Sequence, residues 1–342
     1  MNIILSIFYI ALSALLTKIF CLAAQNSRLI DKPNERSLHS VPTVRGGGFV
    51  FITLSLLSLP ILCYYTQSSM RNEGLFILCI VLLGTVSFFD DLYTLTSKFR
   101  FVIHLLIALV IAFFITINKL DLGLFVVSNQ FLIIPFILFS VIWAINHFNF
   151  MDGLDGFCAS QALFLFVSYS VLFNTSHALL YQEFCFALVC SLIGFLVFNF
   201  PPAKLFMGDI GSASLGLISF YIALIAQQKY QIPIFYWFLL NGLFLFDATI
   251  TLIRRVINKE KWYSPHRKHA YQRLRQFGVS ARKILAGQLV INVIFLILVL
   301  LLQHNKFNLN SVLVVFLGLM VFIYTFIERC FPMFKKTLSA TD

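Results

Sequence analysis

The sequence predicts an all-α protein that crosses a membrane about eleven times. Hydrophobic residues make up 60% of its 342 residues and charged residues only 11%, and its mean hydropathy is +0.90, which is unlike a soluble domain. A helix needs roughly 20 apolar residues to cross the hydrocarbon core. Apolar runs on this scale lie near residues 3–24, 46–65, 74–89, 101–117, 131–146, 157–174, 180–199, 211–227, 232–252, 285–303 and 311–328.

The first run is expected to be a retained helix, because it lacks the basic start and the small-residue end of a cleaved signal peptide. We find no soluble domain, low-complexity tract or repeat, so residues 1–342 are expected to form one transmembrane domain. Helices satisfy their own backbone in lipid, which leaves chemistry to the loops and helix ends. The loops expected to work together are about 25–45, 90–100, 146–156, 200–211 and 254–283.

The positive charges predict the orientation of the chain. Most Lys and Arg residues fall in these same alternate loops and in the C-terminal tail, and such residues remain on the cytoplasmic side. An odd number of spans then places the N-terminus outside and the C-terminus in the cytoplasm. The net charge of +11 suits anionic lipid and nucleotide phosphates. Nucleic acid is not an expected partner, because the basic residues belong to short loops between spans.

Five aspartates lie where apolar runs stop, although the chain has only 14 acidic residues. They are Asp90, Asp91, Asp152, Asp155 and Asp209. Counting spans places all five on the same side of the membrane. Ionisable groups near bilayer depth are costly, so their clustering indicates a site for a divalent cation. The structural alternatives are a polar helix stop at the Asp pair and a helix N-cap at Asp209.

The acidic loop 146–156 repeats oxygen-bearing side chains at Asn146, Asn149 and Asp152. If the segment is helical, this spacing places the three side chains along one face. Oxygen ligands suit Mg²⁺ or Mn²⁺ better than zinc. His147 in the same loop is expected to be a satisfied histidine at a helix end, not a ligand.

Two basic segments are candidates for binding phosphate. In one, Arg45 precedes the glycines 46–48, and backbone amides at a glycine-rich helix start can hold a phosphate. In the other, His266, Arg267, Lys268 and His269 concentrate donors that suit a diphosphate. The alternatives are a solvated hinge loop for the first segment and a basic loop facing anionic lipid for the second.

Four motifs occur in an order that resembles one enzyme family. They are Asp-Asp-Leu at 90–92, Asn-x-x-Asn-x-x-Asp-Gly-x-Asp-Gly at 146–156, Phe-Met-Gly-Asp-x-Gly-Ser at 206–212 and Pro-His-Arg-Lys-His at 265–269. With them, nearly the whole chain resembles the bacterial polyprenyl-phosphate N-acetylhexosamine-1-phosphate transferases. The resemblance implies transfer of a sugar-1-phosphate from a UDP-N-acetylhexosamine to undecaprenyl phosphate, with release of UMP.

The same resemblance implies roles for the singled-out residues. Asp209 looks like the principal metal ligand, with Asp152 beside it, for Mg²⁺ or alternatively Mn²⁺. Asp90 or Asp91 is expected to deprotonate or position the lipid phosphate. The expected substrate-binding residues are Arg45, Asn146, Asn149, Asp155 and the segment His266, Arg267, Lys268 and His269. Attack by the lipid phosphate itself and a covalent aspartate intermediate both stay open.

The resemblance also implies a setting in the bacterial inner membrane, with the N-terminus periplasmic. The opening 31–36 and the histidine segment resemble enzymes that start O-antigen or other surface polysaccharides more than the peptidoglycan-precursor transferase. The expected sugar is N-acetylglucosamine or a 6-deoxy relative such as N-acetylfucosamine or N-acetylquinovosamine. The lipid bilayer is an expected partner, and a homodimer stays open.

Two other classes remain as alternatives. A transporter of nucleotide-sugar or lipid-linked anionic substrates also needs many spans, and Asp247, within 232–252, would suit a transport path. Transporters generally place their sites near the midplane between repeats, whereas these carboxylates gather at one edge. A structural membrane protein is the third class, and it predicts that loss of Asp209 or Asp91 has no effect on function.

Overall fold

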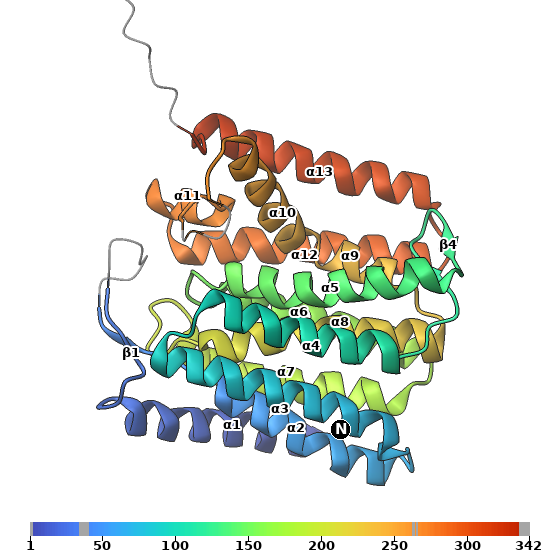
Figure 1. The fold of residues 1–342 in the computed structure, drawn as a ribbon, viewed down its shortest axis with the longest axis horizontal. Helices are drawn as coiled ribbons and strands as arrows, with labels where there is room; N and C mark the ends of the chain where they lie inside the picture. The colour runs from blue at the N-terminus through green and yellow to red at the C-terminus, as the bar shows by residue number, and fades with distance from the viewer. Residues whose placement is uncertain (1–2, 34–40, 262–263, 265, 335–342) are drawn as a thin grey trace, which may run out of the picture.

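A computed structural model of the protein describes residues 3–33, 41–261, 264 and 266–334. Long helices lie side by side in a bundle, with two small antiparallel sheets at its ends (Figure 1). The helices are α1 (Ile3–Ala24), α2 (Gly48–Tyr65), α3 (Met70–Tyr93), α4 (Ser97–Phe114), α5 (Gln130–Phe150), α6 (Phe157–Thr175), α7 (Leu179–Asn199), α8 (Gly208–Tyr230), α9 (Phe235–Leu240), α10 (Gly242–Ile257), α11 (Ala270–Gln276), α12 (Ala281–Gln303) and α13 (Leu309–Cys330). The strands are β1 (Ile30–Asp31), β2 (Thr43–Val44), β3 (Leu120–Asp121) and β4 (Val126–Val127).

Ten helices in the described part of the chain are long and apolar enough to cross a membrane. They match ten of the eleven predicted spans. The remaining one, 232–252, is not a single helix, because it divides into α9 and α10 at Asn241. The Asn241 Nδ2 atom lies 2.6 Å from Nε2 of His147, whose Nδ1 lies 2.8 Å from a carbonyl of its own helix. His147 is therefore a satisfied buried histidine, as predicted, and it also holds the break between the two helices.

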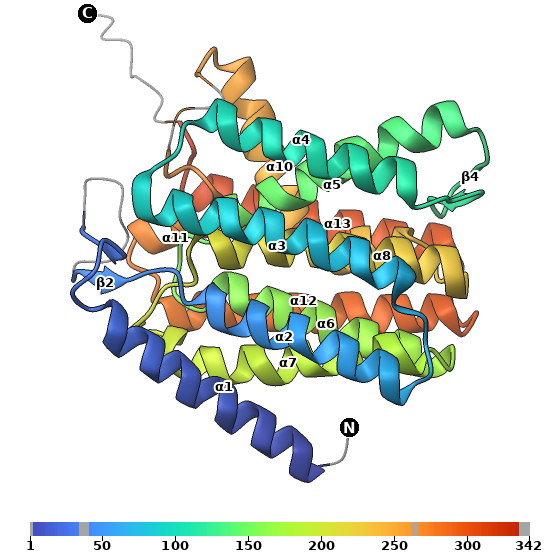
Figure 2. The ribbon, with the colours of Figure 1, turned by 60° about the horizontal axis from the view of Figure 1, so that its bottom comes forward.

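The broken segment still passes from one end of the bundle to the other. Figure 2 shows the start of α1 and the end of α13 at opposite ends of the bundle, which ten passages alone could not produce. The pair α9 and α10 supplies the eleventh passage, although α10 is steeply inclined to the long helices in Figure 1. The side of the membrane on which each end lies stays a prediction.

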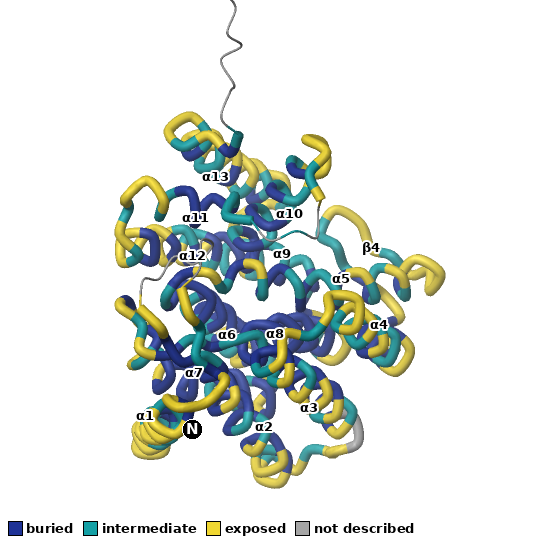
Figure 3. The backbone as a smooth tube through the Cα atoms, turned by 60° about the vertical axis from the view of Figure 1, so that its left-hand side comes forward, coloured by how far each residue is buried: buried dark blue, intermediate teal, exposed yellow. Residues whose placement is uncertain are grey.

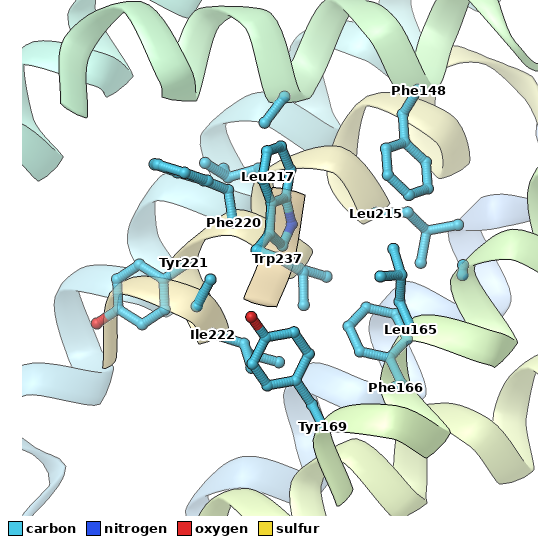
Figure 4. Close-up of a cluster of buried hydrophobic side chains, with 14 of the residues drawn as sticks. Phe148, Leu165, Phe166, Tyr169, Leu215, Leu217, Phe220, Tyr221, Ile222 and Trp237 are labelled. Carbon is cyan, nitrogen blue, oxygen red and sulfur yellow. The ribbon is translucent and has the colours of Figure 1, made fainter. Parts of the chain in front are cut away.

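The centre of the bundle is α8, which packs closely against α3 and α5. Its residues are buried almost without interruption from Ile210 to Ala226. Around its middle, the buried Trp237 lies edge-on to Phe220 at 5.0 Å between ring centroids and donates from Nε1 to Ser219 Oγ at 3.2 Å (Figure 4). This core fixes α8 in the bundle, and α8 carries Asp209 at its first turn.

The outer helices expose apolar side chains, as expected for a surface that faces lipid. Figure 3 shows exposed positions along α1, α4 and α13 and buried ones along α6 and α8. In α1, large residues such as Ile4 and Phe8 are exposed, while the buried positions are Ser13, Thr17 and Ala24. Small and polar residues therefore face the neighbouring helix, which allows close packing in a membrane.

Close backbone contact joins the first and fourth loops. The amide of Phe206 donates to the Val44 carbonyl at 2.8 Å, next to a bridge between Val44 and Leu205. At the start of α2, a Cβ atom on Gly48 would collide with the backbone of Gly211 in α8. Glycine at both positions lets the starts of α2 and α8 touch, which brings the segment before α2 to the residues around Asp209.

Candidate active site

Asp90 and Asp209, from different helices, share one guanidinium group. Asp90 lies near the end of α3 and Asp209 in the first turn of α8. Arg100, near the start of α4, donates from Nη1 to Asp90 Oδ2 at 2.6 Å and to Asp209 Oδ2 at 2.9 Å. Asp90 Oδ1 also accepts from the amide of Leu95 at 2.6 Å. The second and fourth loops therefore meet at carboxylates bridged by a cation, and Arg100 is a residue that the sequence did not single out.

Asp91 closes the N-terminus of α8 from another helix. Its Oδ1 accepts from the amide of Asp209 at 3.1 Å and its Oδ2 from the amide of Ile210 at 3.3 Å. A carboxylate satisfies helix-start amides that have no partner within the helix. The N-cap alternative for Asp209 is wrong, because α8 begins at Gly208 and the Asp209 side chain bonds to Arg100. Asp91 thus holds the helix end that carries Asp209.

The glycines 46–48 do not offer the predicted phosphate cradle. The amides of Gly47 and Gly48 donate to the carbonyls of Phe206 and Met207 at 2.9 and 2.8 Å. These donors are used by the contact between loops, so the expectation of a cradle at the helix start was wrong. Arg45 remains available in part: its Nη2 donates to the Asp91 carbonyl, while its buried Nε has no hydrogen-bond partner.

The carboxamides and the carboxylate of the 146–156 loop do not share one helical face. Because α5 ends at Phe150, Asn146 and Asn149 are helical and Asp152 is not. Asn146 donates to a backbone carbonyl of its own helix at 2.7 Å. Asn149 donates to Ser212 Oγ in α8 at 3.3 Å. The predicted alignment was wrong, since the helix ends before the third member of the pattern.

Asp152 and Asp155 follow α5 in the loop that leads to α6. Asp155 Oδ2 accepts from the amide of Ala203 at 3.0 Å, which ties this loop to the fourth loop. Asp152 is half-buried. Its burial, followed by the nearby charges of Asp209, Asp91 and Asp155, raises the pKa of its carboxyl well above the ordinary value. A raised pKa with this cause indicates a place where an added cation is favourable.

The histidine segment packs against its own neighbours. The rings of His266 and His269 lie 4.8 Å apart, and Lys268 Nζ is paired with the Glu260 carboxylate. Burial, followed by the charges of His269 and Arg255, lowers the pKa of His266 to about 3. A pKa this low favours the neutral ring near neutral pH, so the structure does not support His266 as a source of positive charge for a diphosphate.

A cavity of about 740 Å³ lies where these loops gather, at the end of the bundle marked by β1 and α11 in Figure 1. Its acidic lining residues are Asp31, Asp91, Asp152, Asp155 and Asp209, and its basic ones are Arg45, Arg275 and Arg282. Gln272, Asn199 and the Pro201–Pro202 pair also line it. Carboxylates and guanidinium groups of separate loops therefore face one space large enough for a small-molecule substrate.

The structure brings some predicted residues to the cavity and leaves others outside its wall. Arg45, Asp91, Asp152, Asp155 and Asp209 line it. Asp90, Asn146, Asn149, His266, Arg267, Lys268 and His269 do not. Residues 34–36 of the opening 31–36, and Pro265 of the histidine motif, lie outside the described residues.

The loop 254–283 contributes to the cavity through residues that the sequence did not single out. Gln272 and Arg275 belong to α11, and Arg282 lies at the start of α12. Arg282 also donates to the Pro201 carbonyl from Nε at 3.3 Å and from Nη2 at 3.2 Å. Both arginines were visible as charges in the basic loop 254–283, but no local pattern distinguished them from its other cations.

The oxygen-rich lining fits a magnesium ion bound partly through substrate. The described residues contain no group of three or more His, Cys, Asp or Glu side chains arranged to hold a metal ion. Mg²⁺ commonly takes only one or two carboxylates together with phosphate oxygens and water. Asp152 and Asp209 both line the cavity and could form such a pair of carboxylates. The charge of Asp209 also contributes to the raised pKa of Asp152. The donor set therefore suits a hard cation and offers no sulfur or imidazole site for zinc.

The chain is similar to curated transferases over most of its length. It is 28% identical, over 90% of this chain and 87% of the relative, to a probable undecaprenyl-phosphate N-acetylglucosaminyl 1-phosphate transferase of Bacillus subtilis. It is 28% identical, over 93% of this chain and 96% of the relative, to an undecaprenyl-phosphate alpha-N-acetylglucosaminyl 1-phosphate transferase of Thermotoga maritima.

A second group of relatives is similar over a shorter stretch. The chain is 32% identical, over 61% of its own length and 67% of the relative, to a phospho-N-acetylmuramoyl-pentapeptide-transferase of Listeria monocytogenes. Residues 74–227 match the family model for glycosyl transferase family 4. That stretch runs from α3 to α8 and contains all five aspartates that the sequence singled out. This multi-span membrane protein therefore belongs to glycosyl transferase family 4.

Proposed function

We propose that this protein transfers an N-acetylhexosamine-1-phosphate from its UDP derivative to undecaprenyl phosphate and releases UMP. The observation that carries the proposal is the single cavity lined by four separate acidic positions of the family region and by three arginines. The names of the Bacillus and Thermotoga relatives describe transfer of this kind. Phosphoryl transfer depends mainly on positioning and on charge neutralisation, and such a lining supplies both.

The basic residues are proposed to hold the diphosphate of the donor. Arg45, Arg275 and Arg282 enter the cavity from three different segments of the chain. Guanidinium groups bind phosphate oxygens through paired donors, and the buried Nε of Arg45 has no hydrogen-bond partner. Contacts from separate segments would fix both phosphates in one orientation and share the charge that develops on the leaving UMP.

Asp209 and Asp152 are proposed to hold Mg²⁺, with Mn²⁺ as an alternative. When bound, the ion would neutralise the diphosphate and polarise the phosphoryl group under attack. The carboxylate of Asp209 is held by Arg100, and its helix end is held by Asp91. These contacts would keep Asp209 in place before substrate enters the cavity.

Asp91 is better suited to positioning than to forming a covalent intermediate. Both of its carboxylate oxygens accept backbone amides of α8, so attack by either oxygen would release the start of that helix. Asp90 is similarly engaged by Arg100 and by the Leu95 amide. We therefore favour direct attack by the lipid phosphate, with Asp90 holding Arg100 toward the reacting groups.

The finer assignment follows the sequence motifs. We propose N-acetylglucosamine, or a 6-deoxy relative such as N-acetylfucosamine or N-acetylquinovosamine, as the sugar. The setting would be the bacterial inner membrane, at the start of O-antigen or another surface polysaccharide. A UDP-linked muropeptide is the competing donor, because phospho-N-acetylmuramoyl-pentapeptide-transferases are among the relatives.

The test is UMP release by purified protein from a panel of UDP-sugars, with undecaprenyl phosphate and Mg²⁺. Release with one UDP-N-acetylhexosamine that requires both the lipid and the metal is expected. Turnover only with the UDP-linked muropeptide would overturn the sugar assignment, and silence with every donor would overturn the function. Stoichiometric UMP release without the lipid would contradict direct attack and indicate a covalent intermediate.

A further inference from the structure

One polar face of α10 binds the segment that follows the helix. Asp247, Thr251, Arg254 and Arg255 are spaced four, three and one residues apart and fall on neighbouring turns. Arg255 is buried, and its guanidinium donates to Glu260, to the carbonyls of Lys261 and Ser264 and to Ser264 Oγ. The helix therefore organises the loop before the histidine segment.

Asp247 makes the contacts nearest to the histidines. Its two carboxylate oxygens each lie 2.9 Å from the amide of Ala270, the first residue of α11. Thr251 Oγ1 donates to Oδ1 at 3.0 Å. The same Oδ1 lies 3.6 Å from His269 Nδ1. A carboxylate that is only 6% exposed thus faces both the start of α11 and the imidazole before it.

His269 is the residue before α11, where it forms a capping box with Gln272. It is 4% exposed, and its buried Nδ1 has no hydrogen-bond partner. Tyr271 stacks on the ring at 5.9 Å between centroids, with Phe150 at 6.5 Å. Stacking restrains the plane of the ring but not the position of its proton. The Asp247 carboxylate, 3.6 Å from Nδ1, favours a proton on that nitrogen by electrostatic attraction and so restrains the ring.

The position of α11 decides which residues reach the cavity. The amide of His269 donates to Gln272 Oε1 at 3.3 Å, so the start of the helix also orients Gln272. Tyr271 donates from its hydroxyl to the Phe150 carbonyl at 3.2 Å. Gln272 and Arg275, two and five residues after Ala270, line the cavity. A shift at Ala270 would therefore move both of these lining side chains.

A second contact, from α13, also holds α11. Glu328 in α13 accepts from Arg254 Nη1 and from Arg273 Nη1, each at 2.6 Å. Arg273 belongs to α11, so Glu328 and Asp247 hold the short helix from two directions. With α11 held in this way, its tilt depends on the charge of Asp247 as well as on apolar packing.

We propose that Asp247 is a positioning residue for the donor side of the site. Its carboxylate fixes His269 and the start of α11, and through them sets Gln272 and Arg275 against the cavity. This role rests on the transferase activity proposed above. It assigns a function to an aspartate that lies outside the wall of the main cavity and that would also suit a transport path.

The main test is donor kinetics of Asp247→Asn. The amide keeps an oxygen for Ala270 and Thr251 but removes the charge that faces His269. We expect kcat/KM for the UDP-sugar to fall by about 10–100-fold, as for other partners that orient a functional side chain, with KM for undecaprenyl phosphate unchanged. Asp121→Asn, the same chemical change in the β3–β4 hairpin at the other end of the bundle, should match the wild type.

A double-mutant cycle separates positioning from folding. If Asp247 acts through His269, Asp247→Asn combined with His269→Gln should be no worse than His269→Gln alone. Unchanged donor kinetics in Asp247→Asn would overturn the proposal. So would equal losses for donor and acceptor with a large fall in Tm, which would indicate a structural role only.

Hydrogen exchange tests the proposal even if the proposed activity fails. In Asp247→Ala, the amides of Ala270 and the rest of α11 should exchange faster than in the wild type, and in Asp121→Asn they should not. Faster exchange without any transfer by the wild type would retain the positioning of α11 and reject the transferase function. Unchanged exchange in Asp247→Ala would reject the positioning itself.

Discussion

At the residue scale, the site depends on a close approach between Asp91 and Gly208. Gly208 has φ of +73°, and a Cβ atom there would collide with Asp91 Oδ2 and lie 2.8 Å from the amide nitrogen of Gly46. Glycine is needed both for the backbone conformation and for the space. Any side chain would displace the carboxylate that holds the start of α8.

Gly208→Ala is therefore expected to lower both activity and stability. Positive φ alone costs of order 1–3 kcal/mol for a residue with a side chain, and displacement of Asp91 would disturb Asp209. Transfer activity and Tm of the purified protein measure the two effects. Gly318→Ala is the control, because a Cβ atom there meets nothing within 4 Å. Equal behaviour of the two variants would contradict the role given to this contact.

His266 gives a second prediction, on pH. Its pKa is lowered from 6.5 to about 3 in the folded protein. Between these values the unfolded chain binds a proton that the folded protein does not, so His266 destabilises the fold as pH falls through this window. His266→Gln should flatten the fall in Tm between about pH 6.5 and 4.5 and leave Tm above neutral pH unchanged. Parallel curves for variant and wild type would contradict the burial of this ring.

At the element scale, α3, α7 and α8 are joined at the end of the bundle away from the cavity. Lys229 Nζ lies 3.2 Å from Glu73 Oε1 and donates to Tyr181 Oη at 2.6 Å, and Tyr181 donates to Glu73 Oε1 at 2.7 Å. Glu73 begins the apolar span of α3 whose other end carries Asp90 and Asp91. The cluster therefore restrains the relative position of α3 and α8 along the bundle.

Lys229→Met alone is expected to destabilise the protein more than Lys229→Met combined with Glu73→Gln. Removal of one partner leaves the buried Glu73 without its cation, which costs about 1–3 kcal/mol after allowance for the 30% exposure of the Lys229 side chain. Glu73→Gln with Lys229→Met removes both charges and should restore part of the loss. Thermal unfolding in detergent checks the order. A double variant less stable than Lys229→Met would show that charge pairing is not the cause.

The sequence predicted the positions of the helices better than it predicted their local hydrogen bonds. Long apolar runs specify helices because each must satisfy its backbone in lipid, and ten of them appear as single helices. The break falls at Asn241 and Gly242, a pair typical of turns, but the apolar run on both sides of it predicted one continuous helix. The glycines 46–48 misled for a different reason, because their amides bond to residues 206 and 207, far along the sequence.

At the whole-molecule scale, the sequence predicted the site residues that mark the ends of apolar runs and missed those that depend on packing between loops. Span counting placed the five aspartates on one side because each marks the end of a run, and the loops that carry them meet at one end of the bundle. Arg100, Gln272, Arg275 and Arg282 were missed because their roles come from packing between loops. Asp91 was recognised as a site residue, but its contact with α8 depends on two helices that sequence alone does not dock.

The predicted orientation can be tested on intact cells. In a Cys330→Ser background, which removes the exposed free cysteine, Leu124→Cys adds a thiol between β3 and β4 and Asn258→Cys adds one directly after α10. The background protein without either added thiol is the control for labelling of the remaining cysteines. The charge distribution predicts that a membrane-impermeant maleimide labels position 124 directly and position 258 only after permeabilisation. The reverse labelling pattern would show that the protein has the opposite orientation, with the cavity outside the cytoplasm.

The measurement that tests the central claim most directly follows label from UDP-[¹⁴C]N-acetylhexosamine into an undecaprenyl lipid. Purified wild-type protein and Asp209→Asn would be compared with and without Mg²⁺, after their Tm values have been shown to be equal. We expect metal-dependent lipid labelling by the wild type and a loss of about 100-fold or more in the variant. Equal labelling by the folded variant would remove the carboxylate cavity from the reaction and contradict the account.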